Sequence, residues 1–132
     1  MIDYIVEGNH QTPEVKFRKE GELKLSGRSI PDDADIFYNP VIDWVSEYVK
    51  EAPYHTSFII DLDYLNINSS KKILDILYHL HTLVDNGKKP EVIWFYSDDE
   101  MLEIGQDYDM LLNIPFKFQK RQDFIEVEPV LS

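Results

Sequence analysis

The residues of this chain that could do chemistry gather in one stretch, which runs from Asp61 to Lys72. Two serine hydroxyls, Ser69 and Ser70, stand there between an apolar segment and an amphipathic one. The first backbone N–H groups of a helix have no partner inside the helix and carry the positive end of its dipole. A phosphoryl group on either serine would therefore be stabilised. The same residue types also make an ordinary helix cap, and taken alone the pattern favours the cap.

Two carboxylates precede these serines. Asp61 and Asp63 alternate along an apolar segment, so they project from one face of an expected strand, about 7 Å apart. Such a pair could do acid–base chemistry if desolvation separated its pKa values. No histidine, lysine or glycine loop surrounds them in the sequence, which favours a solvated strand end. The alternative function is a small-molecule-binding or minor enzymatic domain that uses Asp61, Asp63 and Arg28 around a pocket.

The sequence predicts no metal site and no cofactor. His79 and His81 stand two residues apart, which on a helix places them about 200° apart around the axis, so they cannot share one metal ion. The chain contains no cysteine and none of the common glycine-loop, nucleophile-elbow or zinc-protease motifs. We therefore predict that the protein is not an enzyme.

Composition limits the class of protein further. The length of 132 residues predicts one domain, residues 1–132, and 43% hydrophobic content excludes a disordered chain. The net charge of −12 disfavours nucleic acid and anionic membranes as partners, and it would speed association with a basic patch on a protein. No apolar run approaches the roughly 18 residues of a membrane span, and no secretion signal opens the chain. We expect a cytoplasmic protein.

Period-two patterns and continuous apolar runs indicate strands at 15–18, 23–26, 57–65, 92–96 and 116–118, with a further short one at 124–127. The first two flank a turn and predict an antiparallel hairpin, followed by a loop at 27–33. The two long apolar segments, 57–65 and 92–96, predict neighbouring parallel strands at the centre of the sheet.

Three helices are expected between these strands. The first follows an Asn39 cap with Pro40 at its first position and covers 41–49. The second begins near Ser69 and stops before Gly87. The third follows a capping box at 97–100. Helices that join strands imply right-handed parallel crossovers, so the predicted fold is α/β, with a mixed central sheet, an N-terminal antiparallel hairpin and three helices.

The chain resembles a known family, the SiaC-like regulatory phosphoproteins of bacteria, whose fold is similar to that of the STAS-domain anti-sigma-factor antagonists. The order and spacing of short matches across most of the chain carry the resemblance. The matching residues are Thr12-Pro13-Glu14-Val15, Gly27-Arg28-Ser29 with Pro31, Phe37-Tyr38 with Pro40-Val41, Trp44, Tyr64-Leu65-Asn66, Ser69, Lys71, Leu74-Asp75-Ile76, Gly87, Trp94 with Tyr96, Asp99-Glu100, Gly105 and Pro115-Phe116.

The resemblance implies a single STAS-like domain that works as a phosphorylation switch. In the family, a kinase phosphorylates a hydroxyl residue in the turn before the second helix, and a PP2C-type phosphatase removes the phosphate. The unphosphorylated form binds and activates a diguanylate cyclase, which connects the switch to cyclic-di-GMP signalling and biofilms. The family pattern in this turn is Tyr-(Leu/Phe)-Asn-Thr-Ser-Ser, and the threonine that carries phosphate falls on Ile67, which has no hydroxyl.

The sequence therefore leaves the control of the switch open. Either Ser69 or Ser70 carries the phosphate instead, or this member binds its partner without that control, as a plain interaction module. In each case we expect a non-catalytic signalling regulator that docks through the turn before the second helix. The residues expected to contact the partner are Tyr64, Asn66, Ile67, Asn68, Lys71 and Lys72.

Overall fold

The computed structural model describes residues 1–121, so the strand expected at 124–127 lies outside the described part. Residues 1–121 form one six-stranded sheet and three helices. The elements are β1 (Tyr4–Val6), β2 (Glu14–Phe17), β3 (Glu22–Ser29), α1 (Ala34–Tyr48), β4 (His55–Leu65), α2 (Ile67–Asp85), β5 (Lys89–Tyr96), α3 (Asp99–Leu111) and β6 (Phe116–Lys120).

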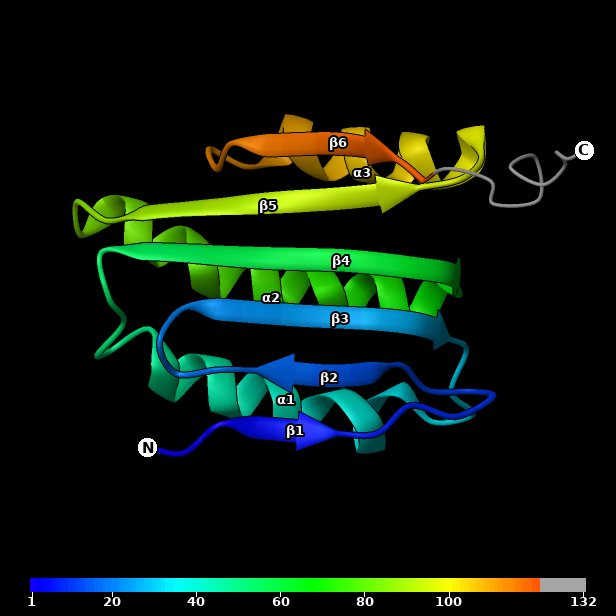
Figure 1. Ribbon diagram of the computed structural model, residues 1–132, viewed down its shortest axis with the longest axis horizontal. Helices are drawn as coiled ribbons and strands as arrows, with labels where there is room; N and C mark the ends of the chain where they lie inside the picture. The colour runs from blue at the N-terminus through cyan, green and yellow to red at the C-terminus, as the bar shows by residue number, and fades with distance from the viewer. Residues whose placement is uncertain (122–132) are drawn as a thin grey trace, which may run out of the picture.

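The strands lie in the sheet in the same order as in the sequence, β1-β2-β3-β4-β5-β6. β1, β2 and β3 are antiparallel neighbours, whereas β3, β4, β5 and β6 run parallel. Each right-handed crossover moves one strand in the same direction, which places α1, α2 and α3 on one face of the sheet (Figure 1). The predicted mixed sheet, its hairpin and the parallel pairing of β4 with β5 are confirmed.

The hydrophobic core lies between the sheet and this layer of helices. From the strands it takes the side chains that point to the helical face, among them Phe17, Leu25, Phe58, Ile60, Leu62 and Trp94. A Cβ at Gly105 of α3 would lie 2.7 Å from the Trp94 ring and 2.8 Å from Phe118, so glycine is needed there for α3 to approach the sheet.

The helix starts differ from the sequence prediction. α1 begins two turns earlier, because the Asp33 carboxylate accepts hydrogen bonds from the N–H groups of Asp35 and Ile36 and caps the helix there. Pro40 therefore lies inside α1 rather than at its first position. The buried side chains of Ala34 and Tyr38 continue the apolar stripe of α1 ahead of Pro40, which explains the longer helix.

Two other helix starts shift by one or two residues. α2 begins at Ile67 behind an Asn66 cap, not near Ser69, and α3 is capped by Asp98, not Ser97. The strands also extend the prediction. β1 was not predicted. β3 extends into the loop expected at 27–33 and ends at Ser29, because it pairs with β4 over its whole length, with a register shift next to Gly27.

Candidate partner-docking site

The site is built on the turn between β4 and α2, a one-residue connection at the carboxyl edge of the parallel strands. Asn66 makes this turn. Its side-chain oxygen accepts the N–H of Ser69 at 2.9 Å, and its backbone oxygen accepts the N–H of Ser70 at 3.0 Å. The N–H of Asn66 donates to the backbone oxygen of Ser29, at the end of β3, at 3.0 Å. The capping role that the sequence left to several residues thus belongs to Asn66.

We call residues 64–72 the docking turn. Its outer surface carries an exposed tyrosine and an exposed isoleucine, Tyr64 at 56% and Ile67 at 74% of full accessibility. Asn68 and Lys71 are also exposed. The Arg28 guanidinium lies 4.6 Å from the centre of the Tyr64 ring, a cation–π contact that orients this ring. Four of the six residues predicted to contact a partner therefore face solvent together.

The two serines of the turn have opposite environments. Ser69 is fully buried, and its Oγ accepts a hydrogen bond of 2.8 Å from Ser29 Oγ. Ser29 Oγ lies 2.5 Å from Tyr38 Oη. Ser70 is half-buried, and its hydroxyl donates to the backbone oxygen of Ile67 at 2.7 Å. Of the two candidate phosphorylation sites, only Ser70 presents part of its side chain to solvent.

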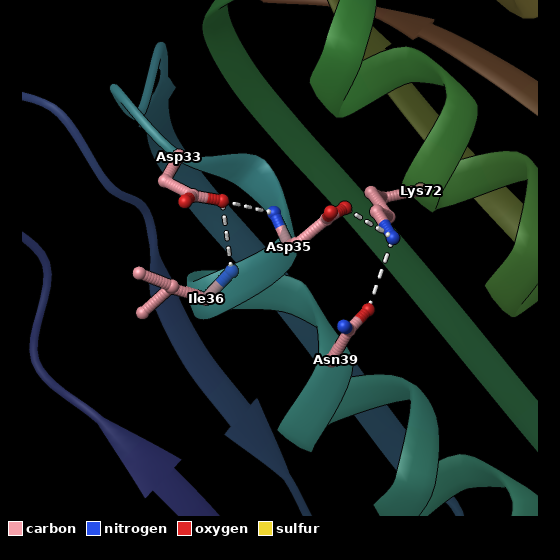
Figure 2. Close-up of polar contacts among 5 residues, drawn as sticks. All are labelled: Asp33, Asp35, Ile36, Asn39 and Lys72. Carbon is pink, nitrogen blue, oxygen red and sulfur yellow. Dashed lines mark hydrogen bonds and ion pairs between the residues drawn. The ribbon is translucent and has the colours of Figure 1, made fainter.

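The side chain of Lys72 contacts α1 and does not point into solvent, as a partner-contacting lysine would. Its Nζ lies 2.7 Å from Asp35 Oδ1 and 3.0 Å from Asn39 Oδ1, so it links the second turn of α2 to the first two turns of α1 (Figure 2). The predicted cap residue Asn39 thus binds this lysine instead of capping α1. Next to Lys72 is a cleft of about 420 Å³, lined by Asp32, Asp33, Ala34, Asp35, Asn68, Lys71, Lys72 and Asp75.

The carboxylates of the alternative function are held by a residue that the sequence analysis did not identify. Arg121 forms ion pairs with Asp61, at 2.9 Å, and with Asp63, and it donates to the Leu62 backbone oxygen at 2.9 Å. Arg28 and Asp63 line a common cleft of about 340 Å³, but Asp61 is not part of that lining. Because one guanidinium is paired with both carboxylates, neither of them is a free acid or base.

Sequence reasoning could not find Arg121, because it lies 58 residues from Asp63 and no local pattern relates the two. The same holds for Tyr108, whose hydroxyl donates to the Ser70 backbone oxygen at 2.6 Å. Among residues 1–121, no group of three or more histidine, aspartate or glutamate side chains could hold a metal ion. In the same part of the chain no helix is long and apolar enough to cross a bilayer.

Tyr38 makes this site sensitive to alkaline pH. Burial raises the pKa of Tyr38 from 10.0 to about 12, although the neighbouring hydroxyls of Ser29 and Ser69 lower it. The resulting stabilisation is complete below pH 10, the unfolded pKa, and is lost as the pH rises through 12, because the unfolded chain ionises first. We expect the free energy of unfolding to fall by on the order of 2–3 kcal/mol across this window through Tyr38.

Urea denaturation at several pH values in this window measures that loss. Tyr38→Phe should flatten the pH dependence. Burial also raises the pKa of Tyr108, and the charge of ionised Tyr38 raises it further to a smaller extent. Loss of Tyr38 therefore flattens the Tyr108 contribution as well, in the same direction as the expected result. The same slope in Tyr38→Phe as in the unaltered protein would contradict the assignment.

The α/β sheet with one helical layer holds an exposed apolar turn on a rigid support, a geometry suited to binding another protein. The chain belongs to the SiaC family: the family described as "SiaC family regulatory phosphoprotein" matches residues 6–121. This result confirms the resemblance seen in the sequence.

Solved structures agree with this assignment. SiaC of Pseudomonas aeruginosa superposes with a TM-score of 0.84 at 26% identity, covering 92% of this chain and 100% of that chain. A chain in the crystal structure of the diguanylate cyclase SiaD in complex with its activator SiaC, from the same organism, has a TM-score of 0.84 at 25% identity, covering 90% and 100%. An uncharacterised protein of Pseudomonas aeruginosa is 25% identical over 126 residues, 93% of this chain and 100% of its own length.

Proposed function

We propose that this chain is a non-catalytic signalling regulator, a single cytoplasmic domain that binds and activates a diguanylate cyclase through the docking turn. The observation that carries the proposal is the exposed Ile67 side chain at the first position of α2, on a turn whose backbone is fixed by Asn66 and Ser29. An apolar side chain on a backbone that is already ordered can be buried by a partner without the entropic cost of ordering the turn. The related SiaC supports the choice of partner, because it was crystallised in complex with the diguanylate cyclase SiaD, which it activates.

Charge supports the same reading. The net charge of −12 favours approach to a basic patch on the partner, and it gives no attraction to nucleic acid. The ion pairs of Arg121 with Asp61 and Asp63 favour a binding role over acid–base catalysis.

Regulation by a kinase and a PP2C-type phosphatase is part of the proposal, with Ser70 as the residue that would carry phosphate. A phosphate there would add roughly two negative charges beside Ile67 and would oppose docking. Ser69 is the less suitable acceptor, because its hydroxyl is buried and hydrogen-bonded.

The direct test adds the purified chain to a diguanylate cyclase of the host and measures cyclic-di-GMP synthesis together with binding by calorimetry. We expect saturable activation at a one-to-one ratio of the two chains. A cyclase whose rate is unchanged, and which gives no binding heat, would refute the proposed partner.

A further inference from the structure

We propose that a buried chain of three hydroxyls, Tyr38, Ser29 and Ser69, positions the docking turn for its partner by tying the first turn of α2 to α1 and β3. This inference rests on the proposed function, because it concerns how the same site is held ready. The three residues are positioning residues: all are fully buried, so none of them can touch a partner directly.

The hydrogen bonds run in one direction along the chain. Ser29 Oγ–H donates to Ser69 Oγ at 2.8 Å. Since that bond uses the only proton of Ser29, the 2.5 Å contact with Tyr38 must have Tyr38 Oη–H as its donor. Tyr38 of α1 thus orients Ser29 of β3, and Ser29 orients Ser69 of α2. These residues are 9 and 40 positions apart in the sequence, so the chain joins separate elements.

Ser29 holds the turn at two points. Its side chain reaches Ser69, and its backbone oxygen accepts the N–H of Asn66 at 3.0 Å. Asn66 in turn caps α2 through the N–H of Ser69. The residues from Asn66 to Ser69 therefore form a closed set of hydrogen bonds with the end of β3, and the exposed side chain of Ile67 projects from within it.

Burial makes this set of contacts selective for one conformation. A buried hydroxyl without a partner costs more than a satisfied one contributes. If the turn moved outward, Ser69 would leave Ser29, and the buried hydroxyl of Ser29 would lose its acceptor. The state of lowest free energy is therefore the one in which the docking turn keeps these hydrogen bonds. A partner that binds the docking turn does not have to order the turn first.

Two further contacts reach the same turn, one from the surface and one from the buried Tyr108. Lys72 bridges to Asp35 and Asn39 on the surface, and Tyr108 of α3 donates to the Ser70 backbone oxygen. Solvent screens the surface ion pair of Lys72, and this lysine lies in the second turn of α2. The ion pair therefore cannot replace the buried hydrogen bond to Ser69 in the first turn.

The experiment compares two tyrosines of α1 that make the same kind of contact at opposite ends of the helix. Tyr38 is bonded to Ser29, whereas Tyr48, equally buried, has its Oη 2.7 Å from Thr56 Oγ1. Tyr38→Phe and Tyr48→Phe each remove one buried hydroxyl from the same helix. Two quantities are measured in each variant: hydrogen exchange of the Ser69 and Ser70 amides, and affinity for the cyclase.

We expect Tyr38→Phe to speed exchange of the Ser69 and Ser70 amides and to weaken cyclase binding, each by about 3- to 10-fold, the factor that loss of one hydrogen bond produces. Tyr48→Phe should leave both within about 2-fold, while urea denaturation shows similar losses of overall stability in the two variants. Equal effects of the two variants at the turn would overturn the inference.

Ser29→Ala supplies a second variant, because it removes the middle link without touching α1. Its effect on the turn should not add to that of Tyr38→Phe, since both break one chain. If the effects of Ser29→Ala and Tyr38→Phe were additive, the three hydroxyls would not act as one unit, and the inference would be wrong. If the unaltered protein does not bind the cyclase, the proposed function fails, whereas the exchange measurement still decides whether the hydroxyl chain holds the turn.

Discussion

Ile67→Asp is expected to abolish cyclase binding while the protein stays folded. Ile67 is 74% exposed, so its replacement removes little from the core. An aspartate at the first position of α2 also complements the helix dipole. In the proposed complex, the variant would lose the burial of an isoleucine, about 1.5–3 kcal/mol, and would bury a carboxylate in its place.

Together these effects should weaken binding by on the order of 3–4 kcal/mol, or about 100-fold or more in Kd. Calorimetric titration of the cyclase measures the change, and urea denaturation confirms the fold. Met110→Asp is the matched control, since Met110 is 85% exposed in another helix. α3 begins at the same edge of the sheet as α2, so Met110, in its last turn, lies at the opposite edge.

The control should bind the cyclase like the unaltered protein. If Ile67→Asp kept its affinity, the docking turn would not be the contact surface. If Met110→Asp lost binding to the same extent, the effect would come from added negative charge on a chain that already carries −12, and not from the turn.

The element pattern of this fold was readable from the sequence because it depends on local periodicity. The apolar run of β4 and the 3.6-residue stripe of α2 predicted a central strand and the helix that follows it. The parallel pairing of β4 with β5 then follows from the crossover rule. The start of α1 was wrong because two caps competed. Asn39 followed by Pro40 has the pattern of a helix start, but Asp33 makes the actual capping bonds.

The site was predictable only in position. The sequence placed the docking turn before the second helix, but Ser69 and Ser70 looked equivalent there, since both are small hydroxyl residues in adjacent positions. Their difference arises from tertiary contacts, which bury Ser69 against Ser29 and leave Ser70 at the surface. The pairing of Asp61 with Arg121 could not be predicted for the same reason, because Asp61 lies within β4 and Arg121 follows β6, and these strands are not neighbours in the sheet.

The burial of Ser69 leads to the last prediction. Ser69→Asp is expected to lower the free energy of unfolding by about 3–5 kcal/mol, because it places a carboxylate in a site without access to water. The dipole of α2 favours a negative charge at this position, but by only about 0.3–1 kcal/mol, so desolvation decides the outcome. Ser70→Asp should change the free energy of unfolding by less than about 1 kcal/mol, since Ser70 is half-buried and its hydroxyl bonds only to the Ile67 backbone.

Urea denaturation of the two variants, with Ser69→Ala and Ser70→Ala as uncharged controls, measures this difference. Cyclase titration of Ser70→Asp should then show binding weakened by about 1–3 kcal/mol, the usual size of a coupling between a modification and a binding surface. Equal stability of Ser69→Asp and Ser70→Asp would mean that the turn opens readily, and it would restore Ser69 as a phosphate acceptor. Unequal stability, with binding reduced in Ser70→Asp, makes Ser70 the residue that a kinase can modify without unfolding the site it controls.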